Sequence, residues 1–194
     1  MSLRIHFAGV GGQGTQTASR VLGEAAIRSD VPVRVAALHG MAQRGGAVTN
    51  QVLLGDVRSP VIEPGEADVL VGFEPMETAR STPLVGPGTI VIASTSRIVP
   101  YILTSMGGTY PDVESLLGPV EKLASRSHRL DAAALAAQAG NVKAVGPVML
   151  GALAALDLLP FDSALLRTVL DDLPDEARRA VNVAAFDLGF TAIE

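Results

Sequence analysis

The sequence predicts an α/β protein with a doubly wound, Rossmann-like and mostly parallel sheet that is flanked by helices. Three observations carry this prediction. A strand, a glycine-rich turn and a helix open the chain, strand-like and helical patterns then alternate, and 48% of the residues are apolar. The 194 residues suit one domain over 1–194, and with only 4% aromatic residues we expect an aliphatic core.

The first elements form a strand–helix–strand unit. Residues 3–8 are a short apolar run before Gly9, and apolar side chains recur at helical spacing over residues 15–28. Residues 31–38 form a second strand pattern, with its proline at the start, where a strand tolerates it. Such a unit predicts a right-handed crossover and a parallel pair of strands.

An antiparallel hairpin is expected as an addition to this sheet. Residues 47–54 alternate like a half-exposed strand. The pair Gly55-Asp56 then predicts a turn into a short strand at Val61-Ile62, antiparallel to the first.

The rest of the chain alternates between strands and helices. Strands are expected at 68–73, at 89–93 and, as a further strand or an edge ribbon, at 98–103. Helices are expected at 76–80, 112–125, 131–139, 148–156, 163–170 and 175–186. Gly118-Pro119 predicts a break in the helix 112–125. Asp131 is the predicted N-cap of the helix that Gly140-Asn141 ends.

Composition and charge exclude several classes of protein. The net charge is −5, and only Lys122 and Lys143 among the 15 basic residues are lysines, which leaves 13 scattered arginines and no basic face for nucleic acid. With no cysteine, the chain forms no disulfide, thiolate zinc site, catalytic thiol or iron–sulfur cluster of its own. Because no apolar stretch approaches the roughly 20 residues of a membrane span, we expect a cytoplasmic protein without membrane contact.

The glycine-rich turn predicts an anion site. Gly9, Gly11 and Gly14 match the spacing G-x-G-x-x-G between a strand and a helix, where Gly12 and Gln13 complete the turn. Backbone N–H groups at the start of the helix favour a phosphate there. The alternative is that the glycines only allow close packing of helix on strand. Nicotinamide dinucleotide is disfavoured, since the second strand ends in Ala37-Leu38-His39 without the acidic residue that would bind the ribose.

A second group of candidate residues follows the second strand. Arg44 is preceded by Gln43 and followed by Gly45 and Gly46, so its guanidinium lies in a loop that bends freely. Loops at the carboxyl ends of adjacent strands face one crevice, so Arg44 could clamp a phosphate or carboxylate beside the glycine turn. The alternative is a surface arginine packed on a turn.

Nothing in the sequence forms a self-sufficient catalytic or metal-binding set. His6, His39 and His128 are far apart and lack partners at the spacing of metal ligands. His6 alternates with apolar neighbours and is expected in the core. No serine lies in a motif that would activate it. We therefore expect no catalytic residue in this chain.

The ordered motifs resemble a known family over nearly the whole chain. The motifs follow one another in the order expected for this family. They are residues 9–14, Arg44-Gly45-Gly46, Gly140-Asn141 and residues 148–152, together with Asn182 and the closing residues 185–189. The chain thus resembles the gamma-type domain of 2-oxoacid:ferredoxin oxidoreductases, and within them most resembles the small (beta) subunit of the indolepyruvate enzymes. Gly146-Pro147 departs from the pattern, because the family often has an asparagine there.

The resemblance implies a reaction that this chain does not run alone. Thiamine diphosphate and iron–sulfur clusters are implied in a large partner subunit, which decarboxylates the 2-oxoacid, passes electrons to ferredoxin and forms an acyl-CoA. No cofactor is then bound covalently or by thiolates in this chain. The implied role here is assembly and help with the coenzyme A or substrate site. The residues implied in cofactor binding are Gly9, Gly11, Gly12, Gln13, Gly14, Arg44, Gly45, Gly46 and Asn141.

Two other functions use the same glycine turn. One is a stand-alone NAD(P)- or flavin-dependent dehydrogenase, and the other is a nucleotide-binding module without catalysis. The apolar residues between 144 and 159 also allow two interpretations. They form either a surface that a partner covers or part of the chain's own core.

Overall fold

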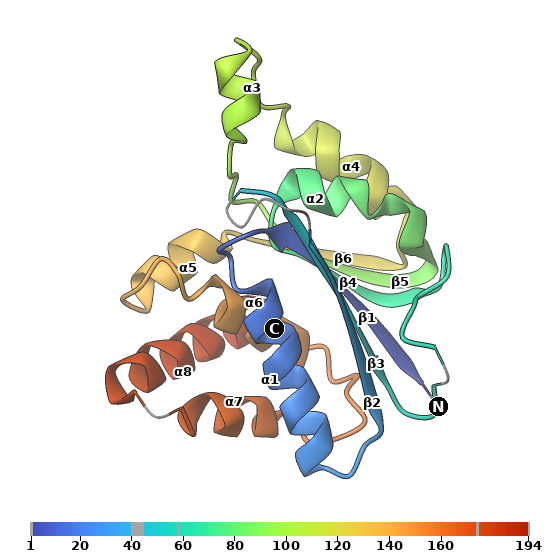
Figure 1. Cartoon of the computed structure of the whole chain (residues 1–194), viewed down its shortest axis with the longest axis vertical. Coiled ribbons are helices and arrows are strands. Elements are labelled where there is room, and N and C mark those ends of the chain that lie inside the picture. Colours follow the sequence, from blue (N-terminus) through green and yellow to red (C-terminus); the bar gives the residue numbers. More distant parts are fainter. Residues whose placement is uncertain (1, 40–44, 58, 174, 194) are drawn as a thin grey trace.

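A six-stranded sheet forms the centre of the computed structural model, which describes residues 2–39, 45–57, 59–173 and 175–193. The strand order is β2-β3-β1-β4-β5-β6 (Figure 1). Their bounds are β1 Leu3–Val10, β2 Val33–His39, β3 Ala47–Leu54, β4 Ala67–Gly72, β5 Val85–Ser94 and β6 Arg126–Leu130. Strands β1, β4, β5 and β6 pair in parallel, whereas β3 is antiparallel to both β1 and β2. The expected mostly parallel α/β sheet is confirmed.

Helices cover both faces of this sheet (Figure 1). Helices α1, α5, α6, α7 and α8 gather on one face, α2 and α4 lie on the other, and α3 projects beyond the sheet. Their bounds are α1 Thr15–Arg28, α2 Pro75–Arg80, α3 Tyr101–Ser105, α4 Val113–Leu123, α5 Ala132–Gln138, α6 Val145–Ala154, α7 Ala164–Asp171 and α8 Glu176–Thr191, with a 3₁₀ turn at Thr82–Leu84. Aliphatic side chains dominate the core on both faces, as the composition predicts.

The expected parallel pairing of the first two strands is wrong. Strand β3 lies between them, with Val10 opposite Ala47 on one side and His39 opposite Val48 on the other. The physical reason is that the chain reverses direction after β2, so β3 returns along β1 and satisfies the hydrogen-bonding groups of both strands. Strand β3 is therefore internal and mostly buried, not half-exposed.

The antiparallel addition exists, but its position differs from the prediction. The hairpin consists of β2 and β3, whereas Val61-Ile62 does not form a strand in the described segment 59–66. The backbone N–H of Ile62 instead donates to the side-chain Oε1 of Gln51 at 2.9 Å. A side chain of β3 thus holds this segment without a second ladder.

Two other expectations are wrong in the middle of the chain, and one strand there was not expected. Residues 98–103 form no strand, because Pro100 cannot donate to a ladder and α3 begins at Tyr101. Strand β6 was not expected, since its mostly exposed residues carry no apolar pattern. Helix α4 continues through Pro119, because buried Leu117 and Val120 pack toward the sheet and offset the missing hydrogen bond.

Helices α6 and α8 cross with their backbones in close contact. A Cβ atom at Gly151 of α6 would lie 2.0 Å from the carbonyl oxygen of Phe186, and one at Gly189 of α8 would lie 1.9 Å from that of Val148. All ten residues of α6 are buried. The apolar residues of this helix therefore belong to the chain's own core, which decides between the two interpretations for that part of the segment.

Candidate functional site

The glycine turn lies where the strand order reverses. In the sheet, β3 and β2 lie on one side of β1, and β4 and β5 lie on its other side. The carboxyl ends of β1 and β4 therefore flank a topological switch point, where α/β proteins commonly bind ligands. A cavity of about 260 Å³ opens there. It is lined by the glycine turn, by the segment after β5 and by the residues before α6: Gly11, Gly12, Gln13, Ser96, Ile98, Ala133, Val142, Lys143 and Val145.

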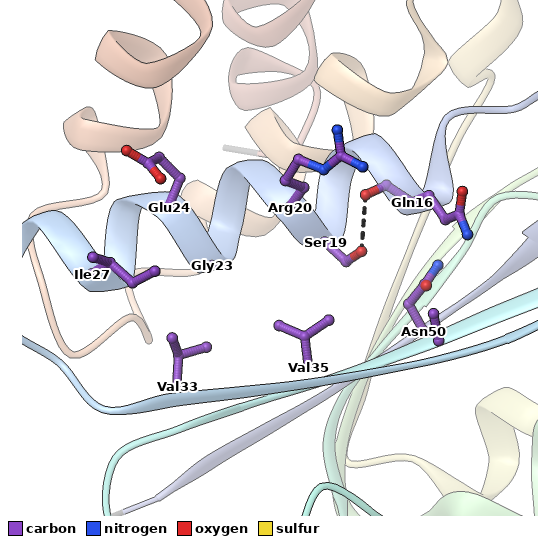
Figure 2. A pocket seen from close by; sticks show the side chains of 10 residues that line it. Gln16, Ser19, Arg20, Gly23, Glu24, Ile27, Val33, Val35 and Asn50 are labelled. Carbon is purple, nitrogen blue, oxygen red and sulfur yellow. Dashed lines mark hydrogen bonds between the residues drawn. The ribbon is translucent and has the colours of Figure 1, made fainter.

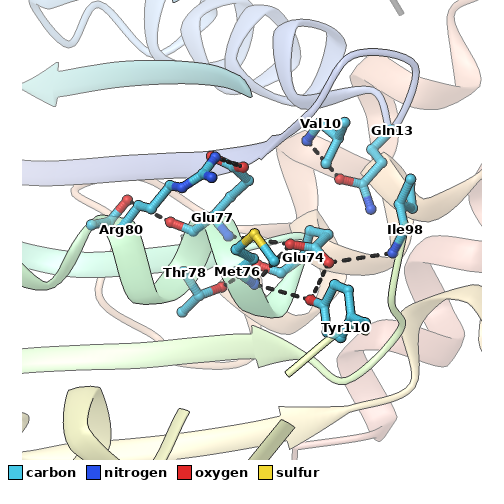
Figure 3. A network of polar contacts seen from close by, with 10 residues as sticks. Val10, Gln13, Glu74, Met76, Glu77, Thr78, Arg80, Ile98 and Tyr110 are labelled. Carbon is cyan, nitrogen blue, oxygen red and sulfur yellow. Dashed lines mark hydrogen bonds and ion pairs between the residues drawn. The ribbon is translucent and has the colours of Figure 1, made fainter. Parts of the chain in front are cut away.

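The buried side chain of Gln13 stabilises the glycine turn through two hydrogen bonds. Its Oε1 accepts the N–H of Val10 at 2.8 Å (Figure 3), and its Nε2 donates to the carbonyl oxygen of Phe73 at 2.9 Å. The side chain is buried and joins the end of β1 to the residue after β4. Because both polar atoms are used within the protein, Gln13 shapes the crevice and leaves ligand contact to the backbone.

The glycines of the turn serve two different purposes. A Cβ at Gly9 would lie 2.8 Å from side-chain carbons of Phe73 and Thr15, so this glycine is required for packing. Gly12 and Gly14 have φ angles of +104° and +86°, which favour glycine. The close-packing interpretation is therefore supported at Gly9, and the positive φ angles explain glycine at positions 12 and 14, whereas the anion site stays a prediction.

Two of the four N–H groups in residues 11–14 are available to a ligand. The N–H of Gly11 donates to Gly46 at 2.9 Å, and that of Gln13 donates to Val10 at 3.1 Å. The N–H groups of Gly12 and Gly14 have no hydrogen-bond partner among the residues that the structure describes. These two donors lie at the start of α1, where the helix dipole favours an anion.

The loop before β3 comes to the same edge of the sheet. Gly46 contacts Gly11 directly, and Gly45 beside it is exposed with a φ of +72°. Arg44 lies outside the described residues. The expected proximity of this loop to the glycine turn therefore exists at Gly46.

Asn141 acts on the crevice through the turn that it forms. Its Oδ1 accepts the N–H of Lys143 at 3.0 Å, and its carbonyl oxygen accepts the N–H of Ala144 at 2.8 Å. This turn places Val142 and Lys143 along the cavity, whereas Asn141 itself does not line it. Lys143 was not a sequence candidate, although it is one of only two lysines and follows the Gly-Asn turn directly.

The buried carboxylate of Glu74 accepts a hydrogen bond from Ile98, one of the residues that line the cavity. Glu74 follows β4 and caps α2, where its Oε2 accepts the N–H groups of Met76 at 2.7 Å and Glu77 at 3.2 Å (Figure 3). Its Oε1 accepts the hydroxyl of Tyr110 and the N–H of Ile98, the latter at 3.3 Å. Burial and the bond to this carboxylate raise the pKa of the Tyr110 phenol. The network ties Ile98, which lines the cavity, and Tyr110 to the residue that caps α2.

The structure does not bring the histidines together. His6 on β1 lies 3.1 Å from the Oγ of Ser81 in the core, as expected, and His128 lies on the edge strand β6. The described residues contain no group of three or more His, Asp or Glu side chains that could hold a metal ion. None of the described helices combines the length and apolar character needed to cross a bilayer.

The position of β2 also bears on dinucleotide binding. In a Rossmann protein the acid that binds the ribose follows a strand next to the glycine turn. Here β3 intervenes, so the end of β2 lies two strands from β1, or roughly 10 Å at the usual strand spacing. Among the described residues, the end of β2 therefore does not offer the ribose contact of a Rossmann dehydrogenase, either in position or in residue type.

Gln13→Ala is expected to lower the free energy of unfolding by about 2 kcal/mol, because the N–H of Val10 and the carbonyl of Phe73 would lose their buried partner. Urea unfolding followed by circular dichroism measures this change. Gln16→Ala is the control, since Gln16 is exposed and its side chain has no partner in the described part of the chain. Equal unfolding midpoints for the two variants would contradict the bracing role.

Comparisons with known proteins agree with one another over the whole chain. The family model described as pyruvate ferredoxin/flavodoxin oxidoreductase matches residues 4–192. Indolepyruvate oxidoreductase subunit IorB from Methanothermobacter thermautotrophicus is 37% identical over 193 residues, which cover 99% of this chain and 98% of the relative. The subunit of the same name from Archaeoglobus fulgidus is 35% identical over 195 residues, with 98% and 94% covered.

The fold has a solved counterpart in a larger chain. The 2-oxoglutarate:ferredoxin oxidoreductase from Magnetococcus marinus, solved with 2-oxoglutarate, coenzyme A and succinyl-CoA bound, superimposes with a TM-score of 0.76 at 21% identity. The match covers 99% of this chain and 31% of that chain.

Proposed function

Because the chain belongs to the pyruvate ferredoxin/flavodoxin oxidoreductase family and is a small subunit of a 2-oxoacid:ferredoxin oxidoreductase, we propose that its complex oxidises an aryl 2-oxoacid such as indolepyruvate to the acyl-CoA. The two IorB relatives, similar along their whole length, support this substrate class. In this proposal the chain contributes to a binding site and to assembly, and the larger subunit performs the chemistry.

The division of cofactors follows from the residues present. An iron–sulfur cluster requires thiolate ligands, and this chain has no cysteine, so its residues do not fit a cluster. We place the clusters and thiamine diphosphate in the larger partner subunit, with ferredoxin as the electron acceptor of the complex. The residues of this chain then bind and orient, and none of them exchanges electrons.

The crevice at the glycine turn is the proposed contact for coenzyme A. The observation that carries this proposal is that the free N–H group of Gly12 and Lys143 meet at one cavity, next to the free N–H group of Gly14 at the start of α1. Backbone donors at a helix start and a lysine are suited to phosphate oxygens. Arg44 would add a second cation from the neighbouring loop. At about 260 Å³ the cavity suits only part of the coenzyme, and we assign it the pyrophosphate.

Loss of either cation is expected to weaken coenzyme A binding. In the complex reconstituted with the larger subunit, Lys143→Ala and Arg44→Ala should each raise KM for coenzyme A about tenfold, the equivalent of one charge-assisted hydrogen bond, with kcat nearly unchanged. Indolepyruvate-dependent viologen reduction measures both constants. Lys122→Ala is the matched control, because Lys122 lies on α4 on the opposite face of the sheet.

Two results would contradict different parts of this proposal. If KM for coenzyme A stays within twofold in both variants, the crevice does not bind the coenzyme, although the chain remains a subunit of the enzyme. If the chain oxidises a 2-oxoacid without any other polypeptide, the proposed division of labour is wrong.

A further inference from the structure

A second cavity, of about 460 Å³, lies between α1 and the edge strand β2 and runs from the first turn of α1 toward Ile27 (Figure 2). Its inner end is formed by Asn50 of β3. The register places Asn50 opposite Ala37 of β2, whose short side chain offers no hydrogen bond to the amide. This cavity plays no part in the function proposed above.

Asn50 is the unusual feature of this cavity. The residue is only 1% exposed, and neither its Nδ2 nor its Oδ1 has a hydrogen-bond partner among the described residues. A buried carboxamide without partners is costly in free energy, and such groups are rare in folded proteins. The amide offers a donor and an acceptor side by side, so one ligand group that carries the complementary pair would satisfy both atoms.

Away from Asn50 the strand side of the cavity is apolar, and the charged residues lie at its rim on α1. Val33, Val35 and Ile27 line it away from Asn50 (Figure 2), and the Val35 side chain is 46% exposed. Glu24 at the rim is paired with Arg28 at 2.9 Å, and Arg20, which also lines the cavity, turns its guanidinium away from Val33 and Val35 (Figure 2). The lining therefore suits a neutral group with an apolar body.

The Gln16 side chain lies at the same end of the cavity as Asn50 (Figure 2). Gln16 lies on the first turn of α1 near Asn50 (Figure 2), and its exposed carboxamide has no partner in the described part of the chain. Rotation of this side chain would uncover the Asn50 amide at little cost, since no hydrogen bond is broken.

From this geometry we propose that the α1–β2 cavity is a second binding site, which takes a neutral group with adjacent hydrogen-bond donor and acceptor on a flat apolar body. Primary carboxamides, lactams and nucleobase edges have this chemistry. The donor–acceptor edge pairs with Asn50, and the body lies against Val33, Val35 and Ile27. The group belongs either to a free small molecule or to the larger partner subunit.

Benzamide is a suitable probe because it combines a primary carboxamide with a flat apolar ring. In NMR titrations of the isolated chain we expect it to shift the amide signals of Ser19, Val35, Ala37 and Asn50, with a Kd of about 1 mM for so small a ligand. N,N-dimethylbenzamide, which cannot donate, and benzoate, which is charged and cannot donate, should bind at least tenfold more weakly.

Two substitutions test the role of the cavity itself. Asn50→Leu should abolish the preference for benzamide over dimethylbenzamide and should raise the unfolding midpoint, because it removes an unpaired buried amide. Ala37→Leu, at an exposed edge position, should block benzamide and leave the unfolding midpoint nearly unchanged. Leu123→Glu on α4 is the control and should alter neither, since Leu123 is exposed on the other face of the sheet.

The same titration in the assembled complex separates the two sources of the ligand. If benzamide still binds, the natural ligand is a free molecule; if binding is lost and the amides of β2 become protected from hydrogen exchange, the partner subunit supplies the group. Absence of benzamide shifts in the isolated chain, equal binding of dimethylbenzamide, or unchanged binding by Asn50→Leu would each overturn the site. The KM of coenzyme A is independent of these results, so the two proposals fail separately.

Discussion

Gly189→Ala is expected to lower the free energy of unfolding by about 4 kcal/mol, at the upper end of the effects of overpacking. The new Cβ would lie 1.9 Å from the carbonyl oxygen of Val148 and 2.7 Å from its carbonyl carbon. Both are backbone atoms of α6, a helix buried along its whole length, so neither can move aside as a flexible side chain would. Helices α6 and α8 must therefore separate. Urea unfolding followed by circular dichroism measures the loss.

Gly23→Ala is the matched control for this prediction. Gly23 is also helical and buried, but the nearest atom to its new Cβ would be the Cγ2 of Val35 at 3.6 Å, which is an ordinary contact. Alanine favours a helix over glycine by about 1 kcal/mol, so this variant should be as stable as the parent chain or more stable. If Gly189→Ala unfolds at the same urea concentration as Gly23→Ala, the tight crossing of α6 and α8 is wrong.

Acidification is expected to remove about 3 kcal/mol of stability through His6 alone. The side chain is 3% exposed, and burial lowers its pKa from 6.5 to about 4. Between these two values the unfolded chain binds a proton that the folded chain does not. The contribution is therefore complete above pH 6.5 and is lost progressively as the pH falls toward 4.

His6→Gln isolates this contribution from that of the carboxylates. Glutamine can keep a hydrogen bond to Ser81 but does not titrate, and the other ionisable groups are shared with the parent chain. Unfolding free energies from urea titrations at pH 7.5, 5.5 and 4.5 give the slope for each protein. The parent chain should lose stability more steeply than His6→Gln below pH 6.5. Parallel slopes would mean that His6 is protonated in the folded state.

Local pattern predicted the elements better than their pairing. The turn at residues 9–14 and helix α1 follow from glycine spacing and helical periodicity, which act within a few residues. The place of β3 depends on which strands it meets, and no local pattern encodes that choice. Its polar residues Asn50 and Gln51 suggest exposure, yet both are buried. The tertiary position of the strand overrides its composition.

The candidate site was predictable to a similar extent. The glycine turn and the loop ending at Gly46 were found from sequence, because each carries a local motif beside a strand. Lys143 and Glu74 were missed, because their places beside the turn result from the packing of α6 and of the segment 98–110. A lysine after a Gly-Asn turn and an acid before Pro75 were the only local signals.

Because β3 is antiparallel to β1 and β2, the length of the β2–β3 connection can change in evolution more readily than that of an ordinary crossover. The connection from β2 to β3 starts and finishes at the carboxyl edge of β1, since Val10 is opposite Ala47 and Gly46 contacts Gly11. Residues gained or lost in that connection would remodel the rim of the crevice while leaving the β1–β3 ladder intact. If the crevice binds a ligand as proposed, its selectivity can thus change among related proteins at only a small cost in folding free energy.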